Sequence, residues 1–485
     1  MAPKTCDIRS LPNETLLNVF LHATAGIFPT LLEHPFPNLS LQTELERIAN
    51  APLLALSRVC SRWHTIAVGT STLWSHLHMH GITERALEQT IALLTNHLER
   101  SQNAPLLVLF KGETFDRHPP HPRIFNLLAQ YSHRWETAHF ICSLKGVDTS
   151  ALRGRLPCLK YFTVACEVRL QHCKPVMPLD FLGTAPCLTR IVAPAPSLLH
   201  SETLRTIRGQ VNNLSLIVLP LHDELHTILR LASELPDAAQ LYLCFDLDPS
   251  ILPQNWDPAL LLPSITSSLK VLGCRVCSAG VQPAPHQLNS VLSQLFDSLT
   301  LPNLEGLDLG YEAYPKFTLS WAPAQHSALL GLCDRSAWGR CLKTLRVSQV
   351  RVSEQQLMEI LSLLGLLEGL EVGDLPSDEE MPLVTDSLLR AMIRENSGQQ
   401  IQLVPRLAHL VCISRLAFTP KLFSDFVVSR LTTAGAKFQV SLYPAANSDP
   451  DVFVESTVHV MLRQLAVDNS CFSYLSGKRH RWMKL

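Results

Sequence analysis

Charged residues are scarce in this chain of 485 residues, and neither sign dominates. The 41 Lys and Arg side chains oppose 42 Asp and Glu, which leaves a net charge of −1. Such a chain has no overall field that would attract nucleic acid or an anionic membrane surface, and we expect neither partner. Hydrophobic residues make up 46% of the chain, which excludes a largely disordered protein. The length exceeds one typical domain, so we expect two units or one elongated array.

Cysteines and long apolar runs are also few. The 14 cysteines are too dilute for a disulfide-stapled scaffold. No run approaches the ~18 apolar residues of a membrane helix, and the N-terminal segment lacks the apolar core of a signal peptide. These absences favour a reducing compartment, and we expect the protein in the cytoplasm or the nucleus.

Motifs of enzymes and metal sites are missing as well. The chain contains no glycine-rich phosphate-binding motif and no nucleophile elbow. Cys274 and Cys277 have the spacing of a zinc half-site, but no second pair stands nearby, so we interpret Cys274 as a core residue. His76, His78 and His80 alternate as on one side of a strand, which indicates a solvated face. We expect no catalytic residue, metal or cofactor; an enzyme with a dispersed site, for example one using a cysteine, stays an alternative.

The first eighty residues carry a set of helix signals. The segment 11–14 reads Leu-Pro-Asn-Glu, which is typical of a helix start because proline tolerates the first turn and a carboxylate there opposes the helix dipole. The apolar residues that follow with helical spacing are Leu16, Leu17, Phe20 and Leu21. A second helix is predicted over residues 52–67. Its apolar stripe consists of Leu56, Val59, Cys60, Trp63, Ile66 and Ala67.

Taken in order, these residues resemble an F-box. The family pattern of Leu-Pro-x-Glu, a short helix, Val-Cys-x-x-Trp and a closing Leu-Trp covers residues 11–76. The resemblance implies an F-box domain over residues 1–80 that docks on the SKP adaptor and so joins the cullin of an SCF-type ubiquitin ligase. The adaptor-binding residues that it implies are Leu11, Pro12, Glu14, Leu17, Phe20, Leu56, Val59, Cys60 and Trp63. A small helical cap on the following region is the alternative.

A long insertion separates the two predicted helices. Residues 22–52 exceed the short connection that is usual in the family, and the insertion resembles those of expanded fungal F-box families. Residues 41–50 within it, LQTELERIAN, are predicted to form an extra helix that ends before Pro52.

A loose leucine unit, Leu-x-x-Leu-x-Leu with substitutions, recurs through residues 81–485. Its nine copies begin at residues 159, 188, 214, 238, 269, 304, 342, 367 and 407. The mean interval is about 31 residues, close to the length of a leucine-rich repeat. The clearest copy is Leu304, Leu307 and Leu309, between which we expect Glu305 and Asp308 to point to solvent. Less regular copies are Leu214, Ile217, Leu219 and Ala238, Leu241, Leu243.

Helical patterns alternate with these units. The last two apolar positions of a unit are two residues apart, as one face of a strand requires. Between two units, Ser353 and Gln356 have the spacing of a capping box. The alternation predicts an α/β fold, and we expect a solenoid with a parallel sheet that resembles the leucine-rich-repeat regions of F-box proteins. An ordinary α/β domain with leucine-rich strands is the alternative.

The resemblance implies a non-catalytic substrate receptor whose repeats hold an unknown protein target. Non-core strand residues would line the target-binding face, and both charge signs occur among them, which favours patchwise complementarity. These residues are Arg190, Glu305, Asp308, Lys343, Arg346, Glu371 and His409. A repeat scaffold without any ligase stays the alternative function.

Overall fold

The computed structural model describes the following residues: 8, 11–25, 51–80, 84–111, 121–142, 144, 146–165, 179–199, 202–218, 222–246, 262–277, 285–311, 321–374, 382–393, 403–415, 417–431, 437–444, 457–468 and 472–476. The chain divides into two compact units, the first built on Met1–Val211 and the second on Asn212–Trp482. The helix predicted for residues 41–50 lies outside the described residues.

The first unit opens with a small helical core. Its elements are α1 (Asn13–Ala25), α4 (Ala51–Ser57), α5 (Ser61–Gly69) and the 3-10 helix η3 (Ser71–Trp74). The buried centre of this core consists of Phe20, Leu53, Ala67, Leu73 and Trp74. The Trp74 indole donates a hydrogen bond of 2.7 Å to the Ala67 carbonyl, so the closing Leu-Trp pair is tied back onto α5.

The single helix predicted over residues 52–67 is wrong, because the chain turns between α4 and α5. Cys60 has an extended backbone, with φ −161° and ψ 170°, and α5 begins at the next residue. The two short helices pack against each other. Folding back brings Leu53 and Ala67 together around Phe20, which a straight helix would not allow. Val59 and Cys60 therefore leave the predicted apolar stripe and are exposed.

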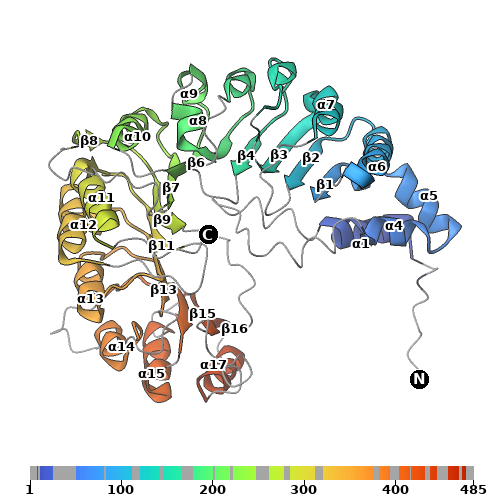
Figure 1. Cartoon of the computed structure of the whole chain (residues 1–485). Helices are drawn as coiled ribbons and strands as arrows, with labels where there is room; N and C mark the ends of the chain where they lie inside the picture. The colour runs from blue at the N-terminus through green and yellow to red at the C-terminus, as the bar shows by residue number, and fades with distance from the viewer. Residues whose placement is uncertain are drawn as a thin grey trace, which may run out of the picture. The chain divides into compact units, whose positions relative to one another are not determined.

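A parallel sheet follows in the first unit, and each strand pairs with the next one along the chain (Figure 1). Its strands are β1 (His76–His80), β2 (Leu106–Lys111), β3 (Trp135–Ile141), β4 (Tyr161–Ala165) and β5 (Arg190–Pro194). The connecting helices are α6 (Leu87–Arg100), α7 (Pro122–Gln130), α8 (Ala195–Leu199) and α9 (Glu202–Ile207).

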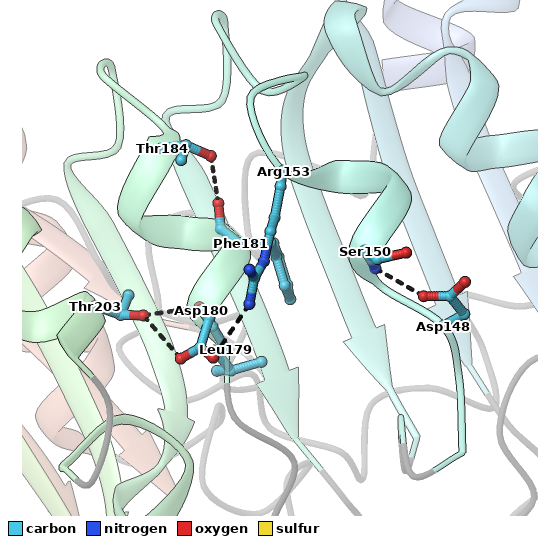
Figure 2. Close-up of polar contacts among 8 residues, drawn as sticks. All are labelled: Asp148, Ser150, Arg153, Leu179, Asp180, Phe181, Thr184 and Thr203. Atoms are coloured by element: carbon cyan, nitrogen blue, oxygen red, sulfur yellow. Dashed lines mark hydrogen bonds and ion pairs between the residues drawn. The ribbon is translucent and has the colours of Figure 1, made fainter.

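Short 3-10 turns replace full helices in part of this unit. They include η6 (Ser150–Leu152) and η8 (Asp180–Thr184). Figure 2 shows how side chains join them: Arg153 reaches the Asp180 carboxylate at 3.4 Å, and the Thr203 hydroxyl donates to the Leu179 carbonyl at 3.3 Å. Neighbouring strand–turn units are thus linked to one another away from the sheet as well as within it.

The second unit continues the same plan. Its strands, in the order of the sheet, are β6 (Asn213–Val218), β7 (Gln240–Asp246), β9 (Val271–Cys277), β11 (Gly306–Tyr311), β12 (Thr344–Ser348), β13 (Gly369–Gly373), β14 (His409–Ser414), β15 (Phe438–Pro444) and β16 (Phe472–Ser476). All neighbouring pairs are parallel. Two short strands, β8 (Ile265–Thr266) and β10 (Leu299–Thr300), pair separately.

Helices lie along one face of the sheet in this unit (Figure 1). They are α10 (His222–Glu234), α11 (Pro285–Ser298), α12 (Pro323–Arg335), α13 (Glu354–Ser362), α14 (Asp386–Met392), α15 (Pro420–Leu431) and α17 (Thr457–Asp468). The predicted capping box is confirmed, because the Ser353 hydroxyl accepts from the Gln356 amide at 3.2 Å and the Gln356 side chain accepts from the Ser353 amide at 3.0 Å.

The predicted leucine positions are buried in seven of the nine units. In the clearest unit Leu304, Leu307 and Leu309 are at most 2% exposed. Two units differ from the prediction. In β6 the buried apolar residues are Leu214, Leu216 and Val218, and the half-buried Ile217 is on the other face of the strand. At the start of the next unit Ala238 is exposed with φ 84°, and Ala239 is buried in its place.

Candidate protein-binding surfaces

One arginine connects the beginnings of α1 and α5. The Arg62 guanidinium donates to the Leu11 carbonyl at 2.5 Å and to the Asn13 side-chain oxygen at 2.7 and 2.9 Å. Arg62 is in the first turn of α5, two residues after Cys60. The Leu-Pro pair before α1 is therefore held beside the turn that contains Val59 and Cys60.

Four residues near these hydrogen bonds of Arg62 form what we call the N-terminal docking surface: Leu11, Pro12, Val59 and Cys60. Pro12 and Cys60 are exposed, Leu11 is half-buried, and Val59 is 60% exposed. An apolar side chain as exposed as Val59 is unremarkable alone, but several together beside a fixed helix start offer a surface that a protein partner can cover. The carboxylate of Glu14, in the first turn of α1, is also exposed at this end.

The other predicted adaptor-binding residues belong to the small helical core or pack against it. Leu17, Leu56 and Trp63 are partly buried against the core, and Phe20 is fully buried. The Phe20 and Trp63 rings meet edge to face with their centroids 4.9 Å apart. Sequence reasoning missed Arg62, since its partners precede it by about fifty residues and no local spacing indicates the contact.

Most of the residues predicted to bind a target neutralise one another. Asp308, Arg346 and Glu371 are in register on β11, β12 and β13. Arg346 bonds to Glu371 at 2.7 Å and to Asp308 at 3.3 Å, and Arg275 from β9 bonds to Asp308 at 2.5 Å. We call the sheet face that carries these side chains the inner strand face.

The expectation that Asp308 points to solvent is wrong. Asp308 is 7% exposed, and Arg275 beside it is 8% exposed. Burial opposes ionisation of the Asp308 carboxyl, but the guanidinium groups of Arg275 and Arg346 outweigh this effect and lower its pKa. The carboxylate therefore serves as the internal counter-ion of two arginines, a role that the sequence did not indicate.

A second, more exposed set of charges lies directly before the strands β9, β11 and β12. Glu305 pairs with Lys270 and with Lys343, the latter at 2.9 Å. These hydrogen bonds lower the pKa of Glu305, and its side chain is 35% exposed. His409 is half-buried on β14, and Arg190 belongs to β5 of the first unit, so the structure does not place all seven residues on one described site.

The remaining candidates include Cys274 and the alternating histidines of β1. Cys274 is buried, as expected of a core residue, and burial raises the pKa of its thiol. His76 and His78 are half-buried on β1. Within the described ranges, no three His, Cys, Asp or Glu side chains gather as a metal site would require. None of the helices described there is both long and apolar enough to span a bilayer.

The N-terminal part of the chain matches a known protein family. Residues 8–80 match the F-box-like family. This segment includes Arg62 and the N-terminal docking surface. An F-box-like domain implies binding to an SKP-type adaptor in an SCF complex. No match was found among curated proteins.

Proposed function

We propose that the chain is a substrate-receptor subunit of an SCF-type ubiquitin ligase. The observation that carries the proposal is the surface of exposed Pro12, Val59 and Cys60 with half-buried Leu11, beside the bond from Arg62 to the Leu11 carbonyl. This surface lies inside the segment that matches the F-box-like family. The adaptor covers this surface, and the cullin follows through the adaptor. The chain itself contributes no catalytic group and acts by raising the local concentration of its target near the charged enzyme. Its place of action is the cytoplasm or nucleus.

The region after residue 80 is, in this proposal, a leucine-rich-repeat-like solenoid. Strictly sequential parallel pairing, leucines buried at the repeat positions and helices along one face support it. The inner strand face then holds the target. Asp308, Arg346 and Glu371 are largely covered by their ion-pair partners. Recognition therefore depends on more accessible side chains at the strand beginnings, above all Lys343, whose side chain is 49% exposed even in its pair with Glu305, and the half-buried His409.

Adaptor docking is tested by placing a charge on the N-terminal docking surface. Val59→Asp in the full chain should weaken binding of a purified SKP-type adaptor by about thirtyfold or more, as expected for a central interface residue worth ~2 kcal/mol. Val460→Asp on α17 is the matched control, because Val460 is also 60% exposed. Circular dichroism checks the fold of both variants. A wild-type chain that does not bind the adaptor would favour the scaffold without a ligase.

Target capture is tested separately on the inner strand face. Arg346 is a poor probe, since reversing its charge would leave Asp308 and Glu371 facing a new carboxylate. Lys343→Ala with His409→Ala avoids this problem. Proteins retained by wild type and by the helix-side control Lys421→Ala should be lost from the double variant, while adaptor recovery stays equal. Retention of the same proteins by the double variant would contradict this face as the target site.

A further inference from the structure

Two exposed cysteines occupy the same position in neighbouring repeats of the first unit. Cys158 stands in the turn 156–159, Leu-Pro-Cys-Leu, and Cys187 in the turn 185–188, Ala-Pro-Cys-Leu. Each turn is closed by the same bond, from the amide of its fourth residue to the carbonyl of its first, at 3.5 and 3.3 Å. In each turn the proline and cysteine are exposed and the flanking apolar residues are buried.

Hydrogen bonds before and after the two turns join the segment of one turn to the segment of the other. Before them, the Gly154 amide donates to the Thr184 hydroxyl at 2.8 Å. After them, the Lys160 carbonyl accepts from the amides of Thr189 and Arg190 at 2.9 and 3.0 Å. Figure 2 shows Arg153 and Thr184 on adjoining turns. Cys158 and Cys187 are therefore equivalent residues of two segments that are paired at both ends.

Equivalent residues of adjoining parallel segments are about 4.8 Å apart, within the range of Cα separations that disulfides span. Parallel Cα–Cβ bonds leave the Cβ atoms slightly farther apart than in a relaxed disulfide, so closure requires a shift of under about 1 Å. An exposed turn can supply that shift because the cysteine amides take no part in the sheet. A bond closed under such strain is also more easily reduced than a structural disulfide.

We propose that Cys158 and Cys187 form a surface dithiol pair that closes to a reversible inter-repeat disulfide when it meets a low-molecular-weight disulfide such as oxidised glutathione. One cysteine thiolate attacks a glutathione sulfur and releases the first glutathione thiolate. The second cysteine thiolate then attacks the cysteine sulfur of this mixed disulfide and releases the second. The two protein thiols are oxidised, one oxidised glutathione is reduced to two glutathione molecules, and these take up the two thiol protons. The inference does not depend on the proposed function.

The full chain, equilibrated with mixtures of reduced and oxidised glutathione and digested with trypsin, tests the pair. Peptide 156–160 should become crosslinked to peptide 170–190, which contains both Cys173 and Cys187. The crosslink should persist in Cys173→Ser and disappear in Cys187→Ser, whose Cys158 should instead carry one glutathione. Excess reduced glutathione should return the wild-type crosslink to free thiols.

Cys341, a half-buried cysteine, supplies an internal control. It precedes Leu342 at the same repeat position, but Asn303 and Leu366 stand there in the neighbouring units, so no cysteine adjoins it in register. Cys341 should therefore gain at most a single glutathione. Separate glutathione adducts on Cys158 and Cys187 without any crosslink, or a crosslink that survives Cys187→Ser, would overturn the proposal. Cys187 is exposed, so circular dichroism should be unchanged in Cys187→Ser.

Discussion

At the scale of single residues, Arg62 shows how a local motif depends on a distant contact. Its guanidinium spans the Leu11 carbonyl and the Asn13 side chain, which no residue of the Leu-Pro-x-Glu pattern could do alone. Hydrogen bonds from a charged group contribute ~1.5–3 kcal/mol, enough to fix an otherwise mobile helix start. The shape of the N-terminal docking surface thus depends on a residue that is itself half-buried.

Arg62→Ala should therefore weaken adaptor binding by roughly tenfold, the effect of losing ~1.4 kcal/mol of positioning. Amide hydrogen exchange at the start of α1 should accelerate in the same variant. Arg62→Lys should recover only part of the affinity, because an ammonium cannot reproduce the guanidinium fork. Arg58→Ala, at an exposed position in the turn after α4, serves as control. Unchanged affinity of Arg62→Ala would contradict the positioning role.

The burial of His139 on β3 predicts that acid destabilises the first unit. Burial, with a contribution from the Arg190 charge, lowers the pKa of His139 from about 6.5 to about 4. The unfolded chain binds this proton near pH 6.5 and the folded chain only near pH 4. The contribution of His139 to the free energy of unfolding therefore has its full value above about pH 6.5. It decreases between about pH 6.5 and 4 and is constant at lower pH. The full loss is about 3 kcal/mol for this group.

The measurement is hydrogen exchange across β3 and β4 at several pH values, with each variant compared to wild type at the same pH. His139→Gln should flatten the decrease in protection between pH 6.5 and 4. His133→Gln should leave it unchanged, because His133 is exposed in the same region. An equal effect of the two substitutions would refute the assignment to His139.

At the scale of elements, adjoining strands are joined by charge as well as by backbone bonds. Asp308→Asn on β11 should destabilise the second unit by ~3–5 kcal/mol, because it leaves the buried Arg275 and the half-buried Arg346 without their shared carboxylate. Glu305→Gln, directly before the same strand, should cost less than ~1 kcal/mol, since its pairs are solvated. Urea unfolding of the two variants gives the comparison. Equal costs would mean that burial of the Asp308 network has no energetic role.

At the scale of the whole molecule, the division into two compact units predicts that a core substitution destabilises only the part of the chain around it. Leu307→Ala opens a cavity between β11 and its helices and should cost ~2–5 kcal/mol. Each strand contacts mainly its neighbours, so hydrogen exchange should accelerate around residues 300–350 and not within residues 11–80. Adaptor affinity should stay at the wild-type value, and Val428→Ala, an exposed change on α15, should alter neither readout. Acceleration throughout the chain would contradict this division.

Local patterns determined much of this protein. The order of helix signals from Leu11 to Trp74 predicted the F-box-like segment, and period-two leucines predicted most strand cores, because both depend on residues within about one turn or strand. The capping box at Ser353 was equally local, and it formed as expected.

Tertiary structure decided the features that the local spacing of residues does not determine. An apolar stripe from Leu56 to Ala67 is compatible with one helix or with two folded around Phe20, and only packing selects the second. Asp308 is read as exposed from its strand position, yet its partners Arg275 and Arg346 lie 33 and 38 residues away in the chain. Burial and pairing of a charge depend on such distant neighbours, so the sequence alone predicted the strands of the inner face but not its electrostatics.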